Sequence, residues 1–351
     1  MIHFDRSMVT ALLAIGIAAQ AQSTAQVPQS NTSTIDAQGT AHVTRVVPLP
    51  ATVSEDGRKF MAQPRSDADP RTSLAENRAN AEKWQETLAR DMQSMYPAAL
   101  SRDTIAGVPV RIITPPSIPD DKKDRVLLNV HGGGFQADWG SVAETVPIAS
   151  LTHTRVVAVL YRLAPEHPFP AQVEDTIAVY RELLKTYKPR NIALYGTSAG
   201  AILTGEVAVR LNQMGLPLPG ALGIFSGSGD FARPGDSLAI FGLWGLSGFL
   251  ENPGARGPDA YVGQTDPRDP VLSPIFADLK AMPPALFLTS ERDLLLSGTS
   301  NLHRAFRKAG ADAELIVFDG LHHAFWNEFR LPESVEADRI IADFFDRHLG
   351  K

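Results

Sequence analysis

The chain has 351 residues, of which 44% are apolar and 21% charged, an ordinary balance for a globular protein with one large α/β domain or two small ones. Its formal net charge is −6, and it has no basic stripe that could follow a phosphate backbone, which argues against nucleic acid as a partner. It has no cysteine, which excludes a thiol nucleophile, a disulfide framework and a cysteine-based metal site.

The first residues have the pattern of a secretory signal. Arg6 supplies a cationic start, residues 8–19 are apolar, and Ala-Gln-Ala at 19–21 offers a cleavage site between small residues. The apolar stretch is too short to span a bilayer comfortably, so a stable membrane anchor is not expected. The sequence therefore predicts a signal peptide at residues 1–21 and a periplasmic or secreted protein, with an ordinary buried helix as the alternative.

Residues 22–66 are rich in Gln, Ser, Thr, Ala and Pro, which predicts an extended arm or linker without a core of its own. A helix is predicted from Ser73, where Ser-Leu-Ala-Glu fits a capping box. Trp84 and Met92 lie on one apolar face of this helix, and Pro97 ends it.

Short apolar segments then alternate with helical ones. Strands are predicted at 104–106, 108–113, 125–130, 156–160, 191–195, 221–225, 285–288 and 314–318. Helices are predicted at 171–186, 199–214, 298–309 and 333–348. This order predicts an α/β fold with a mainly parallel sheet covered by helices on both faces, in which reactive groups gather at the carboxyl ends of the strands.

A long interval interrupts this alternation between the strands at 221–225 and 285–288. It contains an apolar, glycine-rich stretch at 238–250, which is typical of a lid over a binding cleft. The same residues could instead form the core of a small helical subdomain, and the two interpretations are compatible. We expect a catalytic domain at 67–351 whose cap comes from about 67–100 and 228–265.

Gly-Thr-Ser-Ala-Gly at residues 196–200 lies between a predicted strand and a predicted helix. This context is typical of a nucleophile elbow, a sharp turn that exposes the oxygen of Ser198 and leaves room only for glycine on either side. The pentapeptide alone is a weak signal, because Ser and Gly also cluster in ordinary turns, as at 227–229. A serine nucleophile further needs a base, an acid that orients the base, and donors for the oxyanion.

Candidates for all three exist. The candidate for the oxyanion donors is His-Gly-Gly-Gly-Phe at 131–135, which follows a strand and leaves backbone amides unshielded. A phosphate-binding loop is the alternative, but it would require a Lys and a Ser or Thr next, and these are absent. Of the nine histidines, His322 and His323 lie in the loop expected after the last strand. The acid candidates at strand ends are Glu291, Asp293 and Asp319. The adjacent histidines are a weak metal signal, and no His-Glu-x-x-His motif is present.

Three motifs together resemble the hormone-sensitive-lipase-like family of α/β-hydrolases, in particular its bacterial esterases. They are His-Gly-Gly-Gly-Phe at 131–135, Tyr-Arg-Leu-Ala-Pro-Glu-His-Pro-Phe-Pro at 161–170 and Gly-Thr-Ser-Ala-Gly at 196–200, in the order and separation typical of that family. The resemblance runs from about Val126 to the C-terminus. It implies the α/β-hydrolase fold, a mostly parallel sheet flanked by helices with a helical cap.

The resemblance also implies roles. Ser198 would be the nucleophile, Asp293 the acid and His323 the base, in the chain order usual for this fold. The oxyanion hole would consist of the amides of Gly133, Gly134 and Ala199, with His131 bracing the turn. Two departures from the family pattern are Thr197, which places the chain in the Gly-Thr-Ser-Ala-Gly branch, and the leucines that follow Asp293, which leave Glu291 as the alternative acid.

The resulting expectation is a carboxylic-ester hydrolase that acts on short-chain acyl esters through an acyl-enzyme and needs neither a metal nor an organic cofactor. Its partner would be a small-molecule ester, and the family resemblance also suggests a homodimer. Lactone or amide hydrolysis by the same triad, and non-catalytic ligand binding on the same scaffold, are the alternatives. Aromatic residues predicted to line an acyl pocket, or else to fill the core of the cap, are Phe231, Phe241 and Trp244.

Overall fold

The computed structural model describes residues 31–63, 72–243, 246 and 260–350. The chain divides into two units, residues 1–48 and 49–351. The predicted signal peptide at 1–21, and Trp244 of the predicted acyl pocket, lie outside the described residues.

The first unit contains a two-stranded antiparallel hairpin, in which β1 (Thr32–Ile35) pairs with β2 (Ala41–Thr44). Asp36 accepts hydrogen bonds from the amides of Gln38 and Thr40, at 2.9 Å each, and so closes the turn between the strands. All eight strand residues are exposed. The arm predicted at 22–66 therefore includes regular structure that its polar composition did not indicate.

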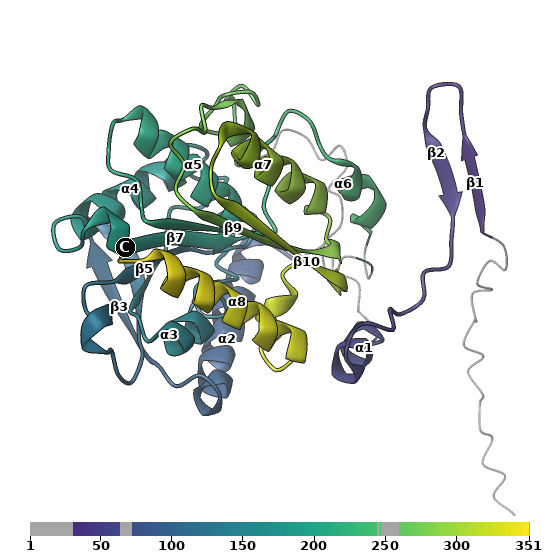
Figure 1. The fold of residues 1–351 in the computed structure, drawn as a ribbon. Helices are drawn as coiled ribbons and strands as arrows, with labels where there is room; N and C mark the ends of the chain where they lie inside the picture. Colours follow the sequence, from purple (N-terminus) through teal and green to yellow (C-terminus); the bar gives the residue numbers. More distant parts are fainter. Residues whose placement is uncertain (1–30, 64–71, 244–245, 247–259, 351) are drawn as a thin grey trace, which may run out of the picture. The chain divides into compact units, whose positions relative to one another are not determined.

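The second unit is built on a sheet that, among the described residues, has eight strands in the order β10-β9-β8-β7-β5-β6-β4-β3 (Figure 1). All neighbours from β10 to β6 in this order, including β5, pair in parallel. In contrast, β4 pairs antiparallel with both β3 and β6. Their bounds are β3 (Ala99–Ile105), β4 (Val108–Thr114), β5 (Val126–Val130), β6 (Val156–Val159), β7 (Ile192–Thr197), β8 (Ala221–Phe225), β9 (Ala285–Arg292) and β10 (Ala313–His322).

This strand order creates a switch point between β5 and β7. The chain passes from β5 outward to β6, returns across β5 to β7, and then continues to β8, β9 and β10. Loops that follow β5 and β7 leave the same edge of the sheet side by side, which is where open α/β sheets bind ligands. The predicted fold, a mostly parallel sheet flanked by helices, is confirmed.

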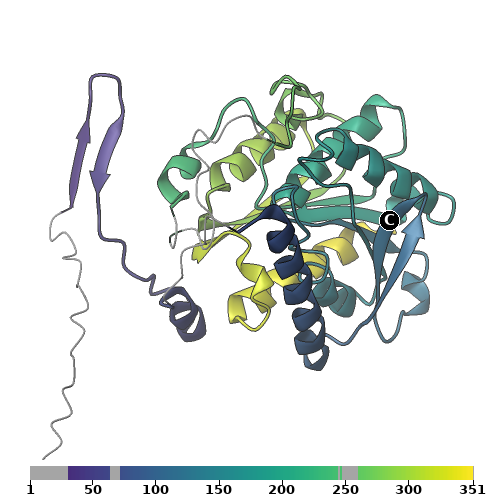
Figure 2. The same ribbon diagram turned by 180° about the vertical axis from the view of Figure 1, so that it is seen from behind.

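Helices cover both faces of this sheet (Figures 1 and 2). One face packs against α4 (Ala171–Leu183), α5 (Ala199–Gln213) and α7 (Leu296–Ala309), and the other against α2 (Leu74–Asp91), α3 (Val146–Thr152) and α8 (Pro332–His348). Two short helices, α1 (Glu55–Met61) and α6 (Asp236–Phe241), complete the set that the structure describes.

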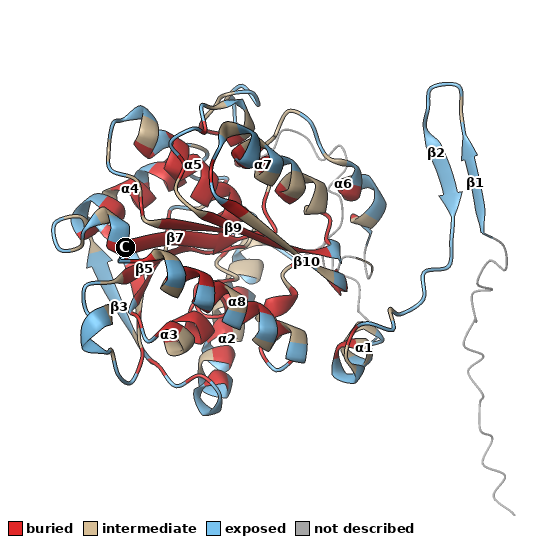
Figure 3. Ribbon diagram, in the orientation of Figure 1, coloured by how far each residue is buried: buried red, intermediate tan, exposed pale blue. Residues whose placement is uncertain are grey.

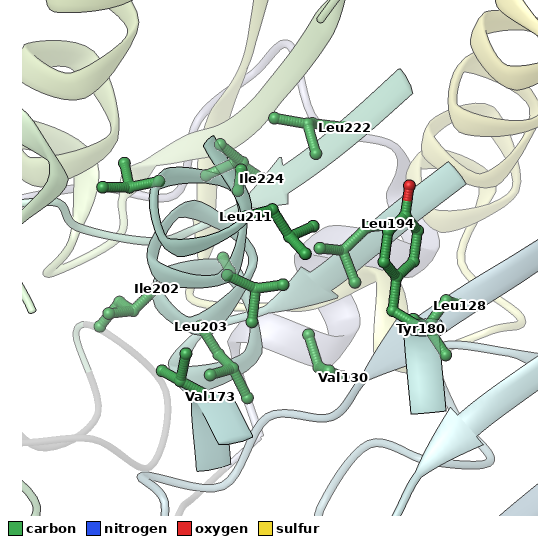
Figure 4. Packing of buried hydrophobic residues seen from close by; sticks show 14 of the residues in the cluster. Leu128, Val130, Val173, Tyr180, Leu194, Ile202, Leu203, Leu211, Leu222 and Ile224 are labelled. Carbon is green, nitrogen blue, oxygen red and sulfur yellow. The ribbon is translucent and has the colours of Figure 1, made fainter. Parts of the chain in front are cut away.

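The central strands are buried on both faces, as Figure 3 shows for β5, β7 and β9. In β5 and β7, side chains alternate between the two cores: Leu128 and Leu194 face α5, while Leu127 and Tyr195 face the opposite layer. Figure 4 shows Leu194 beside Leu211 of α5, so the helix that follows the Gly-Thr-Ser-Ala-Gly motif is held against the strand that precedes it.

The unit with the sheet begins earlier than the residue-67 boundary that the sequence predicted. Val53 is buried in it, and Ser54 caps α1 by accepting a hydrogen bond from the amide of Gly57. The amide and hydroxyl of Ser54 also donate to Glu333 of α8, at 2.6 and 3.0 Å. Within the described ranges, none of the helices combines the length and apolar character needed to cross a bilayer.

Candidate active site

Ser198 lies between β7 and α5 in a backbone conformation that side chains rarely adopt, with φ 58° and ψ −120°. The turn is so tight that the flanking glycines touch the end of β5. A Cβ atom at Gly196 would lie 2.1 Å from the carbonyl oxygen of Val130, and one at Gly200 would lie 1.9 Å from it. The two glycines are therefore required by packing, and the predicted nucleophile elbow has the geometry expected of it.

Asp293 and His323 meet at the ends of neighbouring strands. Asp293 follows β9, His323 follows β10, and Oδ1 of Asp293 lies 2.8 Å from Nδ1 of His323. The other carboxylate oxygen of Asp293 accepts hydrogen bonds from Thr289, at 2.9 Å, and from the hydroxyl of Ser226. This arrangement fixes the imidazole with Nε2 directed away from the acid.

The electrostatics of Asp293 favour its charged form. Burial alone would raise the pKa of this carboxyl group. The opposing effects are larger: they are the charge that His323 can carry and the hydrogen bonds from His323, Ser226 and the amide of Leu295. The pKa of Asp293 therefore lies below its ordinary value, and the group is an anion at neutral pH. A buried anion in contact with an imidazole stabilises the imidazolium that forms when the imidazole takes a proton.

The loop that carries His323 is fastened to the elbow that carries Ser198. Trp326 donates a hydrogen bond from its ring nitrogen to the hydroxyl of Thr197, at 3.1 Å. The amide of Ser198 donates to the carbonyl of Phe225, which is next to Ser226. No hydrogen bond joins Ser198 to His323 in this structure. Nε2 of His323 is buried and has no hydrogen-bond partner among the described residues.

The predicted oxyanion turn follows β5. Gly133 and Gly134 have φ values of 123° and 61°, which side chains disfavour, and a Cβ at Gly133 would lie 1.9 Å from the carbonyl oxygen of Ala137. A Cβ at the preceding Gly132 would lie 3.4 Å from Cβ of Ser198, so the turn passes beside the serine. None of the described residues accepts a hydrogen bond from the amides of Gly133, Gly134 or Ala199.

His131 begins this turn, and it contacts the backbone of the turn and the ring of Tyr161. Its ring is buried, stacks on Tyr161 at 4.2 Å between ring centres, and its Nδ1 lies 2.9 Å from the carbonyl oxygen of Gly132. The hydroxyl of Tyr161 donates to the carbonyl of His131 at 2.6 Å. These contacts fit the bracing role that the family resemblance implied.

Glu144 is a residue of this site that the sequence did not single out. Its carboxylate accepts hydrogen bonds from the amide of Gly132, at 2.9 Å, and from Asn129 of β5, at 3.1 Å, and it also contacts the amide of Thr197. Complete burial raises the pKa of Glu144 to about 8, although these donors oppose the rise. Glu144 thus joins the oxyanion turn to the nucleophile elbow, and the polar Asn129 within an apolar strand was its one signal in the sequence.

The alternative acid Glu291 does not contact His323. Glu291 is exposed, and a hydrogen bond with Asp319 raises its pKa, so it faces a second carboxyl group rather than His323. Phe231 and Phe241 are both half-buried, the latter at the end of α6. Phe231 packs near Tyr261, with 6.0 Å between ring centres. The acyl pocket stays a prediction.

In the ranges that the structure describes, no group of three or more His, Asp and Glu side chains is arranged to hold a metal ion. The reactive groups gathered at this site are the half-buried hydroxyl of Ser198, the buried imidazole of His323 with its anionic partner, and free backbone donors.

Comparison with known proteins supplies the family. Residues 127–327 match a family of the α/β-hydrolase fold. The chain belongs to this family. Residues 127–327 include the oxyanion turn, the nucleophile elbow, Asp293 and His323.

Similar proteins within the family are esterases. A protein from Acinetobacter venetianus named esterase is 30% identical over 237 residues, which cover 63% of this chain and 74% of that protein. An acetyl-hydrolase from Streptomyces hygroscopicus is 32% identical over 240 residues, covering 66% and 79%. A crystal structure of an esterase from the bacterial hormone-sensitive lipase family has a TM-score of 0.70 and 33% identity, covering 84% of this chain and 96% of its own. The predicted resemblance is confirmed, and the chain is a hormone-sensitive-lipase-like α/β-hydrolase.

Proposed function

We propose that this carboxylic ester hydrolase works through Ser198, His323 and Asp293. The hydroxyl of Ser198 attacks the ester carbonyl carbon while its proton passes to Nε2 of His323, and the carbonyl oxygen becomes an anion. Collapse of this tetrahedral species breaks the bond to the alcohol, which leaves with the proton from His323. Water then attacks the acyl-enzyme by the same route, releasing the acid and restoring Ser198.

The observation that carries the proposal is the pairing of His323 with Asp293, at 2.8 Å, in a loop that Trp326 fastens to the nucleophile elbow. The pairing holds Nδ1, so that Nε2 is the nitrogen left to act as the base. Hydrogen bonds between nucleophile and base are often long or absent without substrate, so a missing bond between Ser198 and His323 is compatible with the proposal. The free amides of Gly133, Gly134 and Ala199 supply the donors for the oxyanion.

The test is Ser198→Ala. We expect it to lower kcat for a short p-nitrophenyl ester by about 10⁴-fold or more while the circular dichroism spectrum and melting temperature stay close to those of the parent. Near-normal turnover by this variant would show that Ser198 is not the nucleophile.

A small acyl group is the second part of the proposal. It is supported by the name of the Streptomyces hygroscopicus relative, an acetyl-hydrolase. Measured over p-nitrophenyl esters from acetate to palmitate, kcat/KM should be highest among the short chains, and a maximum at palmitate would overturn this part alone.

We further propose export, on the signal-like pattern of residues 1–21. Mass spectrometry of the protein from a periplasmic fraction should give a mass that corresponds to cleavage near Ala21, and an intact N-terminus there would contradict it.

A further inference from the structure

The segment that follows the triple-glycine turn has no regular structure to hold it. Between Phe135 and Thr145 it contains neither helix nor strand, yet much of it is buried. Buried backbone groups need partners, and in a loop those partners are usually side chains from elsewhere. Side chains of one helix, α2, hold three of these backbone groups, and Figure 2 shows this helix on the surface of the unit that contains the sheet.

Gln85 of α2 makes two of these contacts. Its side-chain nitrogen donates to the carbonyl of Asp138, at 2.8 Å, and its oxygen accepts from the amide of Val142, at 2.6 Å. Gln85 and Val142 are fully buried, so removal of the amide side chain would leave the backbone amide of Val142 without a partner and away from water.

Arg78, about two turns earlier on α2, makes the third contact with the backbone of this segment. Its Nε donates to the carbonyl of Gln136, at 2.7 Å. Its terminal nitrogens donate to the carbonyl of Ala164, at 2.9 Å, and to both carboxylate oxygens of Glu166. The amide of Ala164 in turn donates to the carbonyl of Phe135, at 2.9 Å. One guanidinium thus fastens α2 to the glycine turn and to the segment at 161–170.

These contacts lie immediately beside the oxyanion donors. The amides of Gln136 and Ala137 both donate to the carbonyl of Gly133, at 3.1 and 3.2 Å. A Cβ at Gly133 would already collide with the carbonyl oxygen of Ala137, so the two backbones are in close contact. A shift of residues 136–138 must therefore move the peptides of Gly133 and Gly134.

We propose that Arg78 and Gln85 are positioning residues for ester hydrolysis. Through their hydrogen bonds to the segment after the turn, α2 keeps the amides of Gly133 and Gly134 in the orientation that stabilises the developing oxyanion. The inference rests on the proposed function, because it concerns the same oxyanion. Donors aimed at the place where charge develops stabilise the transition state more than the bound ester, so their displacement lowers kcat and leaves KM nearly unchanged.

The experiment compares two variants with two matched controls in the full-length protein. Gln85→Leu and Arg78→Met remove the hydrogen bonds from α2 to the segment after the turn while keeping much of the side-chain volume. Gln93→Leu removes another amide side chain that bonds to backbone groups, the carbonyls of Ala89 and Ala98. Gln93 lies just beyond the end of α2 and makes no hydrogen bond to the turn. Arg102→Met removes an ion pair that β3 makes with Glu82 of α2.

Each variant is titrated with a fluorophosphonate to count active sites, and kcat, KM and the inhibition constant of an alkyl trifluoromethyl ketone are measured per active site. The ketone forms an adduct whose oxygen occupies the position of the oxyanion. We expect Gln85→Leu to lower kcat by about 10- to 100-fold and to raise the inhibition constant by a similar factor, with Arg78→Met intermediate and both controls within about twofold of the parent.

If Gln85 and Arg78 had only a structural role, their variants would have a lower melting temperature and fewer active sites, but an unchanged kcat per active site and an unchanged inhibition constant. That result would overturn the proposal. So would a loss of kcat without any rise in the inhibition constant. Failure of the proposed function is distinguishable, since it would leave Ser198→Ala active. Because Arg78 is partly exposed, Arg78→Met keeps the test available if Gln85→Leu does not fold.

Discussion

At the scale of single residues, the contact between Asp293 and His323 favours Asp293 over Glu291, the alternative acid that the sequence offered. Asp293 is buried and bonded to the imidazole, whereas Glu291 is exposed and paired with Asp319. We expect Asp293→Asn to lower kcat by about 10³- to 10⁴-fold, because the amide favours the wrong tautomer of His323. Glu291→Gln is the matched control and should stay within about twofold. A larger loss for Glu291→Gln than for Asp293→Asn, in p-nitrophenyl ester assays, would reverse the assignment.

The motif around Ser198 could be recognised in the sequence because its local backbone requires particular residues. Both glycines of the elbow lie against the carbonyl of Val130, so the pentapeptide predicts the sharp turn at Ser198 without any knowledge of tertiary contacts. Glu144, Gln85 and Arg78 had no such signature, because a long loop and a separate helix bring them to the site. Tertiary contacts of this kind leave no periodic pattern in the sequence.

At the scale of secondary structure, prediction succeeded where the local pattern and the fold agree. The capping box at Ser73 is present, with both reciprocal hydrogen bonds, and α2 begins there. The short α3 was missed, because it is almost entirely buried and so lacks a polar face with helical spacing. The strand predicted at 314–318 extends to His322, so that His323, and not His322, is the first residue after it.

A buried acid in α5 predicts how stability depends on pH. Glu206 is fully buried with its carboxylate on the hydroxyl of Tyr261; burial, and to a lesser extent the charge of Asp269, raise its pKa well above the ordinary value. The unfolded chain releases this proton near pH 4.5, so the stability that Glu206 contributes is full below that pH and falls as the pH rises towards the folded pKa.

We therefore expect Glu206→Gln to lose less stability than the parent between about pH 5 and pH 9, with the difference growing as the pH rises. Urea unfolding at several pH values measures this. Glu336→Gln, at an exposed position of α8, is the control and should follow the parent curve. Parallel curves for Glu206→Gln and the parent would contradict the assignment of a neutral Glu206.

At the scale of the whole molecule, the boundary between the two units is testable by truncation. Val53 and Ser54 belong to the unit that contains the sheet, through burial and through the hydrogen bonds to Glu333. Removal of residues 1–48 should leave the melting temperature and kcat unchanged, while removal of residues 1–66 should lower the melting temperature by a few degrees. Equal melting temperatures for the two truncated proteins would mean that residues 49–66 add no stability. The predicted homodimer stays a prediction.

Covalent labelling of the purified protein with a fluorophosphonate, followed by peptide mass spectrometry, tests whether Ser198 is the nucleophile. We predict one adduct per chain, on the peptide that contains Ser198, and strongly slowed labelling in His323→Gln, because the imidazole takes the proton of the attacking hydroxyl. An adduct on another residue, or active enzyme that remains unlabelled, would contradict it.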